Sequence, residues 1–352
     1  SHWKLCLQCR ACEAVCPSGV PYGKLMQTAR SYIEINHPTH NIFSRFLHWL
    51  SFEKLLPYQG RLQILLKTLS LYQRSGLQWL IRKSHILDLI PGDLGKLEAN
   101  LPLISKQFLK PKGETIPATT TKRATVGLLS GCIMPLTHEP SMRALIRVLN
   151  YNGCDVILPQ NQVCCGALNS HAGYIETAKD LARKNIDAFL SAGLDAVIVG
   201  SAGCGASMKE YPELLASDSE YHPKAIKFSG IVKDIHEFLV ELPFYAPKTQ
   251  VKEQVTYQDS CHLKHAQRIN TSPRIILNSI PGLELIEMPN SDKCCGAAGS
   301  YTITQRKFAK RLLDSKMKDI CSTNARIIAT ANPGCVIQLE NGANNLNFEF
   351  DV

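Results

Sequence analysis

Four cysteines lie close together near the start of the chain, in CLQCRACEAVCP (6–17). Cys6, Cys9 and Cys12 are each separated by two residues, and Cys16 follows after three more, directly before a proline. Thiolates at such short intervals can surround one metal centre, because a two-residue loop lets both sulfur atoms face the same point. The spacing therefore predicts metal binding, either to an iron–sulfur cluster or to zinc.

An iron–sulfur cluster is the better match for this opening motif. Bacterial ferredoxins with two clusters carry the run CxxCxxCxxxCP, whose fourth cysteine binds the other cluster. Zinc sites also use CxxC pairs, but seldom in an uninterrupted run that ends in CP. We therefore expect residues 1–40 to be the C-terminal half of a ferredoxin-like domain with two [4Fe-4S] clusters. No second run follows in the chain, so we expect its partner motif upstream of Ser1, and no stable cluster on the opening motif without it.

Eight further cysteines recur in two sets of four, and each set contains a CCG triplet. The sets are Cys132, Cys164, Cys165 and Cys204, and then Cys261, Cys294, Cys295 and Cys335. The intervals between equivalent cysteines differ by only one residue, which indicates one structural unit used twice. Each set of thiols could hold one metal centre. We expect a cluster in each, with zinc in one of them as the alternative.

The segments around these cysteines alternate between strand and helix patterns. A short apolar run, DVILP (155–159), follows a helical stretch at 139–153, and a long amphipathic helix is predicted over 170–193. Such alternation predicts a parallel sheet with helices on both faces. Sites in these sheets lie where strands end and helices begin. We therefore expect each set of thiols at one rim, near helix N-termini that stabilise thiolates, with Gly166 and Gly296 allowing tight turns.

The fold class that follows is α/β, with two repeated parallel-sheet lobes behind smaller segments. The expected order is the ferredoxin-like half at 1–40, a helical connector at 41–110, a linker at 111–124, and lobes at 125–225 and 226–352. The connector is rich in leucine and aromatic residues at helical spacing, with breaks near Pro57–Gly60 and at Gly76. Its seven basic residues at 41–90 would suit a surface that binds an anionic membrane or a partner subunit. The alternative, which we prefer, is that the connector helices pack over the cysteine-rich domains.

The composition of the chain indicates the cellular compartment and the kind of partner to expect. The chain has 352 residues, of which 45% are hydrophobic and 20% charged, and it contains 14 cysteines. Clustered thiols in a chain with a large core are typical of metal ligands in a reducing compartment, so we expect a cytoplasmic protein. The net charge of +9 favours an acidic partner or an anionic membrane surface. No dinucleotide, flavin or phosphate-binding fingerprint is present, and we expect no nucleic-acid partner.

Three phrases resemble one family of redox proteins. CLQCRACEAVCPSGVPYGKLM (6–26), SGCIMP (130–135) and DSCHLKHAQ (259–267) are similar to the CCG-domain redox subunits, and most of all to the iron–sulfur subunits of glycolate oxidase (glycolate dehydrogenase). The resemblance covers essentially the whole chain. It implies an electron-transfer subunit without flavin or catalytic residues, acting with flavin subunits that oxidise a 2-hydroxy acid. It further implies electron delivery toward quinone or the respiratory chain at the cytoplasmic face of the inner membrane.

The chain departs from one branch of that family, the heterodisulfide reductase subunits, in which CCG is followed by CxxC. The first of those positions is Ser201 in one lobe and Asn332 in the other. Four thiols in each lobe imply an ordinary [4Fe-4S] cluster in place of the unusual five-thiol form. Direct reduction of a disulfide or quinone by a lobe stays an alternative, as does a structural role with zinc.

Four residues near these motifs have open roles. His262 and His265 could tune a cluster or replace a ligand, although such histidines are more often ordinary helix residues. Cys154 and Cys321 fit neither set, and we expect both to be buried apolar thiols.

Overall fold

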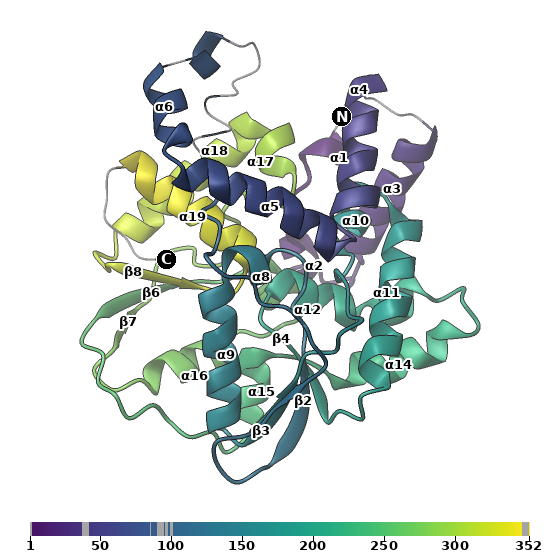
Figure 1. The fold of residues 1–352 in the computed structure, drawn as a ribbon, viewed down its shortest axis with the longest axis vertical. Helices are drawn as coiled ribbons and strands as arrows, with labels where there is room; N and C mark the ends of the chain where they lie inside the picture. The colour runs from purple at the N-terminus through teal and green to yellow at the C-terminus, as the bar shows by residue number, and fades with distance from the viewer. Residues whose placement is uncertain are drawn as a thin grey trace.

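The computed structural model describes residues 2–36, 42–84, 86–89, 95, 98, 101–346 and 352. Two β-sheets built mainly from parallel strands lie at its centre, and helices cover them (Figure 1). The predicted α/β fold with two repeated parallel-sheet lobes is confirmed. None of the helices in these described ranges combines the length and apolar character that crossing a bilayer requires.

The first sheet has the strand order β1-β3-β2-β4-β5. Its strands are β1 (Thr115–Ile116), β2 (Ala124–Leu128), β3 (Cys154–Ile157), β4 (Ala196–Val199) and β5 (Val232–Asp234). All neighbouring strands pair in parallel except β1, which runs antiparallel to β3 at the edge. Because β1 falls within the expected linker at 111–124, part of that linker belongs to the sheet.

Helices cover both faces of this first sheet. They are α8 (Met134–Thr137), α9 (Glu139–Tyr151), α10 (Ala167–Ala172), α11 (Ile175–Leu190), α12 (Ala202–Lys209), α13 (Tyr211–Leu214), α14 (Tyr221–Ile231) and α15 (Ile235–Glu241). In β4, Val197 and Val199 join the core formed with α11, whereas Ala196 and Ile198 join the core formed with α9. Successive side chains of a strand point to opposite faces. Two covered faces therefore explain why this strand is apolar throughout.

The long helix predicted over 170–193 is two helices, α10 and α11, separated at Gly173. This glycine has φ +96°, in the left-handed region that favours glycine. A Cβ here would lie 3.1 Å from the backbone oxygen of Arg30, which belongs to α3 (Tyr22–Asn36). The amphipathic pattern of 170–193 therefore predicts helix correctly. The break arises because a distant segment of the chain packs against this point.

The second sheet has the order β7-β6-β8, which repeats the order β3-β2-β4 of the first. The elements of this lobe are β6 (Gln254–Gln258), the π-helix η3 (His262–Ala266), α16 (Ser272–Asn278), β7 (Glu284–Ile286), α17 (Tyr301–Thr304), α18 (Arg306–Cys321), β8 (Ile327–Thr330) and α19 (Pro333–Leu346). Its core packs Leu313 and Met317 of α18 against Ile328 of β8 and Leu339 of α19. The smaller sheet therefore presents the same three-strand unit.

The expected border between the lobes falls inside a helix. Residues 225 and 226 both fall within α14, and the following strand β5 pairs with β4 of the first sheet. Helix α15 then packs against β4 and β5. We therefore propose that the first lobe extends through α15 and that the border lies in the segment 242–253.

The connector is helical up to residue 89, as predicted, and the opening segment also contains helices. They contain α1 (His2–Leu5), α2 (Ala11–Ala14), α3, α4 (Ile42–Trp49), the π-helix η1 (Leu50–Leu55), α5 (Gln59–Arg74), α6 (Leu77–Ser84) and the short 3-10 helix η2 (Ile86–Leu89). The expected breaks at 57–60 and at Gly76 separate η1, α5 and α6. Positions 41, 85 and most of 90–100 lie outside the described residues, and the last part of the expected connector, 101–110, forms no helix.

The connector packs on the first lobe, which agrees with the preferred interpretation of its sequence. Leu62 of α5 joins the core around Cys132, and Gln59 Nε2 donates to the Gly131 backbone oxygen at 2.6 Å. The side chain of Asn169 donates to the Phe52 backbone oxygen at 2.6 Å. Helix α5 thus covers the rim that carries the first set of cysteines (Figure 1).

Candidate metal centres

The first set of thiols gathers at the C-terminal ends of three adjacent strands. Cys132 follows β2, Cys164 and Cys165 follow β3, and Cys204 lies in the first turn of α12 after β4. The Sγ atoms of Cys164 and Cys132 are 3.4 Å apart. Cys132, Cys164 and Cys165 belong to one buried core, and Cys204 packs against it half-buried. The parallel sheet therefore brings together four residues that are far apart in sequence.

Electrostatics in this set favour loss of the Cys164 proton and oppose loss of the protons of Cys132 and Cys165. Hydrogen bonds from Cys132 and Cys165 and the Gly166 N–H hold the pKa of Cys164 well below its ordinary value. The pKa values of Cys132 and Cys165 are raised well above it, because each is hydrogen-bonded to Cys164 and buried. A bound metal would supply the positive charge that lets all these thiols ionise together.

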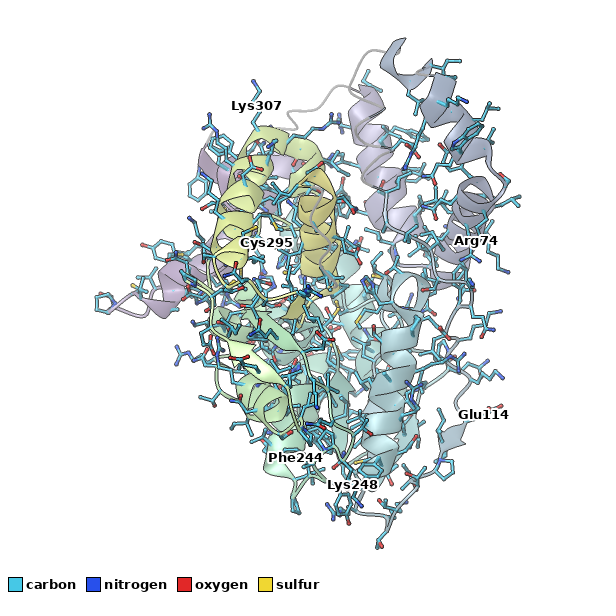
Figure 2. All side chains as sticks on the ribbon, turned by 90° about the vertical axis from the view of Figure 1, so that its left-hand side faces the viewer. Arg74, Glu114, Phe244, Lys248, Cys295 and Lys307 are labelled. Atoms are coloured by element: carbon cyan, nitrogen blue, oxygen red, sulfur yellow. The ribbon has the colours of Figure 1, made fainter. Side chains whose placement is uncertain are left out.

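The second set repeats this arrangement in the second lobe. Cys261 follows β6, Cys294 and Cys295 follow β7, and Cys335 lies in α19 after β8. The pKa of Cys294 is again held well below its ordinary value by hydrogen bonds from Cys261 and Cys295, and the pKa values of those two are raised. Figure 2 shows Cys295 beside the paired helices α18 and α19. The positions of all four cysteines and the electrostatics of the first three therefore follow the repeat.

The glycine of each CCG triplet is required by its surroundings. Gly166 has φ +81° and Gly296 has φ +89°, which side chains rarely adopt. A Cβ on Gly166 would lie 3.3 Å from Cα of Ala178, and one on Gly296 would lie 2.8 Å from the Ala309 backbone oxygen. The two glycines therefore let the paired cysteines approach the long helix behind them, α11 or α18.

Buried amides fix the cysteine loops of the first lobe. Asn185 accepts from the Val163 N–H at 2.9 Å and donates to the Cys164 backbone oxygen at 3.0 Å. The side chain of Gln162 accepts from the Ser130 N–H at 2.7 Å. Because these amides are buried and paired, the loops are held in place independently of any metal.

In the second lobe, the ion pair between Asp259 and Arg274 holds the loop that leads to the cysteines. Asp259 is buried two residues before Cys261, and both of its oxygens accept from Arg274 at 2.9 Å. Burial alone would raise the pKa of Asp259, but hydrogen bonds from Arg274 and Ser291 hold it below its ordinary value. The bidentate geometry fixes the backbone that leads into the second set of thiols.

The opening motif has a different character and lies against the second lobe. Its cysteines are half-buried or, for Cys12, exposed. The Gln8 backbone oxygen accepts from His262 Nε2 at 2.9 Å, and the Leu5 backbone oxygen accepts from the Tyr301 hydroxyl at 3.0 Å. Burial, and then the charge of Cys294, raise the pKa of Cys9. The motif therefore faces the second set of thiols, a contact that sequence patterns did not indicate.

The histidines have partners other than thiols. His262 bonds Gln8 as described, and His265 Nε2 lies 3.4 Å from the Asp292 backbone oxygen. His171 of α10, which the sequence analysis did not select, packs edge-on against His262 with ring centroids 5.2 Å apart. Burial lowers the pKa of both His171 and His262. No local pattern marks His171, because its neighbour comes from the other lobe.

The two remaining cysteines differ from each other. Cys154 is fully buried in the core beside α9, as predicted, and burial raises its pKa to about 11. Cys321, at the end of α18, is half-buried, so the prediction of a buried thiol was wrong there. Neither thiol belongs to a set.

The donor sets fit iron–sulfur clusters. Each lobe offers four thiols, and soft thiolate sulfur selects iron–sulfur clusters, zinc or copper(I) over hard cations. Within the described ranges, no three cysteine, histidine or carboxylate side chains form a group of the kind that holds a single metal ion. The twelve ligands predicted from the sequence therefore stay predictions. The structure brings eight of them together as two sets, each with three buried cysteines and one half-buried, and leaves the opening four near the surface.

Two family models match most of this architecture. The model described as "Cysteine-rich domain" matches residues 126–209 and 255–340, one match to each lobe. The model described as "Glycolate oxidase iron-sulfur subunit, linker region" matches residues 43–101, which hold α4 to α6. These matches place the two cysteine sets in two copies of one known domain and identify the connector as a known linker.

Known proteins are similar along nearly the whole chain. A probable glycolate oxidase iron–sulfur subunit of Bacillus subtilis is 42% identical over 96% of this chain and 77% of its own length. The glycolate oxidase iron–sulfur subunit of Escherichia coli is 30% identical with the same coverage. Lactate utilization protein A of a Geobacillus species is 28% identical over 61% of this chain and 90% of its own length. With both lobes and the linker matched, the chain belongs to the family of glycolate oxidase iron–sulfur subunits.

Proposed function

We propose that this chain is an electron relay in a flavin-dependent 2-hydroxy-acid (glycolate) dehydrogenase. Electrons would pass from flavin subunits through this chain toward quinone or the respiratory chain. The observation that carries the proposal is the pair of four-thiol sets, each with three buried cysteines, on matching rims of two repeated sheets. Two equivalent sites in one chain, with a third cysteine motif beside the second, form a series of electron carriers more naturally than one catalytic centre.

The thiols of each lobe are the proposed ligands of one [4Fe-4S] cluster, and zinc in one lobe is the alternative. A bound cluster accepts and releases single electrons at a potential set by charge, hydrogen bonds and exposure. The chain's own residues supply these conditions. Burial shields six of the eight thiols from water, and the buried Asn185 and the half-buried Arg274 hold their loops. The opening motif would add its clusters in a complete ferredoxin-like domain.

A surface for partner subunits lies on the outer side of the connector. Ile64, Leu71 and Trp79 are each more than three-fifths exposed, and Lys83 lies over the Trp79 ring at 4.7 Å. Exposed apolar side chains of this size on neighbouring helices mark an interaction surface. We assign this face to a flavin subunit; binding of the isolated chain to anionic lipid vesicles, lost in Trp79→Glu, would assign it to the membrane instead.

The decisive experiment counts metal in the reconstituted chain. After anaerobic reconstitution, iron and acid-labile sulfide should reach about eight of each for the two lobes, if each holds one [4Fe-4S] cluster. Low-temperature EPR after dithionite reduction should show two signals. Cys165→Ser and Cys295→Ser should each remove one signal and about half of the iron. Cys154→Ala, which changes a thiol outside both sets, is the matched control and should remove neither.

The opposite result is equally clear. Stoichiometric zinc with little iron, and no EPR signal on reduction, would refute the relay and leave the lobes a structural role.

A further inference from the structure

The two lobes meet at the residues that replace the additional cysteine of the five-thiol relatives. Ser201 stands between β4 and α12, three residues before Cys204. Asn332 stands between β8 and α19, three residues before Cys335. Equivalent positions of the repeat therefore face each other across the border between the lobes. The neighbouring backbone joins there too, since the Ala202 N–H donates to the Ala331 oxygen at 3.0 Å.

One side-chain amide connects the two thiol sets at this border. Asn332 Oδ1 accepts from the Ser201 hydroxyl at 3.2 Å and from the Gly203 N–H at 3.3 Å. Its Nδ2 donates to Cys335 Sγ at 3.7 Å. Ser201 and Gly203 belong to the first lobe, directly before Cys204, and Cys335 belongs to the second set. Asn332 thus contacts the last cysteine of its own set and the residues that lead to the last cysteine of the other.

The orientation of this amide is fixed by its neighbours. A backbone N–H can only donate, so the Gly203 N–H requires the oxygen of Asn332 on its side. If the amide were turned over, two donors would face each other there. The Nδ2 group must therefore point to Cys335. A Cβ on Gly203 would lie 3.4 Å from Asn332 Oδ1, so this position lies against the amide.

The bond pattern makes the two sets unequal. Cys335 receives an amide N–H from the residue three positions before it, whereas the matching Ser201 directs its hydroxyl to Asn332. Donors to ligand sulfur stabilise the more negative, reduced cluster and so raise its reduction potential.

We propose that Asn332 is a positioning residue that makes the second lobe the stronger electron acceptor and holds the two thiol sets in register. The inference rests on the proposed function, because it requires a cluster in each lobe. It places the preferred resting site of the electron in the lobe that contacts the opening motif, where His262 is bonded to the Gln8 backbone oxygen. Electrons reaching the first lobe would then move to the second and toward the opening motif.

The test measures the reduction potential of each cluster by EPR-monitored redox titration of the reconstituted chain. Asn332→Ala removes the donor, and Asn332→Asp keeps the shape but replaces the N–H with a charged oxygen. Both should shift the potential of the second cluster to more negative values, the aspartate more strongly, and leave the first unchanged. Parallel titrations in Cys165→Ser and Cys295→Ser backgrounds identify the lobe. Ser201→Ala, the matched control, leaves the N–H to Cys335 in place and should not move the second potential.

The possible failures are distinguishable. Full iron content in Asn332→Asp with an unmoved second potential, or with equal shifts in both lobes, would overturn this inference alone. A wild-type chain that binds zinc and little iron would overturn the proposed function together with it. If Asn332→Ala loses iron, the isosteric aspartate variant still decides the question.

Discussion

Replacing Gly296 with alanine should destabilise the second lobe by a large and calculable amount. The backbone has φ +89°, and placing an L-residue in this left-handed region costs about 1–2 kcal/mol. The added Cβ would lie 2.8 Å from the Ala309 oxygen and 3.2 Å from the Leu312 Cβ. Relief of such overpacking costs about 1–3 kcal/mol more. We expect a loss of about 2–5 kcal/mol, a large part of the stability of an ordinary domain.

The assay is urea unfolding of the metal-free, reduced chain, followed by circular dichroism. Gly193→Ala is the matched control, because Gly193 also has positive φ but a Cβ there would meet nothing within 4 Å. It should lose only about 1–2 kcal/mol, the cost of the backbone conformation. Gly166→Ala, with its nearest contact at 3.3 Å, should fall between the two. A Gly296→Ala variant no less stable than Gly193→Ala would refute the reasoning from close packing.

Three further predictions concern the supports of the thiol loops. Arg274→Met should reduce the free energy of unfolding by about 3 kcal/mol, because it leaves the buried Asp259 carboxylate without its main partner. The control Lys310→Met breaks an exposed pair and should change the free energy of unfolding by less than about 1 kcal/mol. Equal effects of the two variants in urea unfolding would contradict this prediction. Asn185→Leu should lower iron binding in the first lobe only, because the amide of Asn185 holds the Cys164 loop. Loss of iron from both lobes, measured by iron analysis and EPR of the reconstituted variant, would contradict this prediction. Burial lowers the pKa of His171, so on acidification the unfolded chain binds a proton at this residue before the folded chain does. The free energy of unfolding should therefore fall as pH drops below about 6.5. Urea midpoints at pH 7.5 and pH 5 should show a smaller fall in His171→Gln than in the unchanged chain.

The sequence predicted those parts of the site that local pattern and repetition encode. Each set of thiols follows strands whose apolar runs are visible in the chain, and the parallel sheet brings strand ends to one rim whatever lies between them. The glycine of CCG also carries its own signal, because a paired cysteine beside a helix leaves no room for a Cβ. Cys132 and Cys335 could therefore be placed without knowledge of the rest of the molecule.

Contacts between distant segments account for the features of the fold and the site that the sequence did not predict. Gly173 breaks a good helical pattern because Arg30, far away in sequence, approaches it. The two residues of β1 are exposed, so they show no alternation that would reveal a strand. The bond between Ser201 and Asn332 joins two lobes whose relative position no periodicity encodes. Each of these features depends on tertiary packing, which overrides local preference.

The opening segment is fastened to both lobes at once. Arg10 pairs with Glu210 at the end of α12 in the first lobe, while the Gln8 backbone is bonded to His262 in the second. These two contacts oppose rotation of one lobe relative to the other, because such a motion would break a partly buried polar contact. If each lobe holds a cluster, as proposed, the spacing between the two clusters is then a fixed property of the folded chain. Since tunnelling falls steeply with distance, this short segment would then influence the rate of the proposed electron transfer.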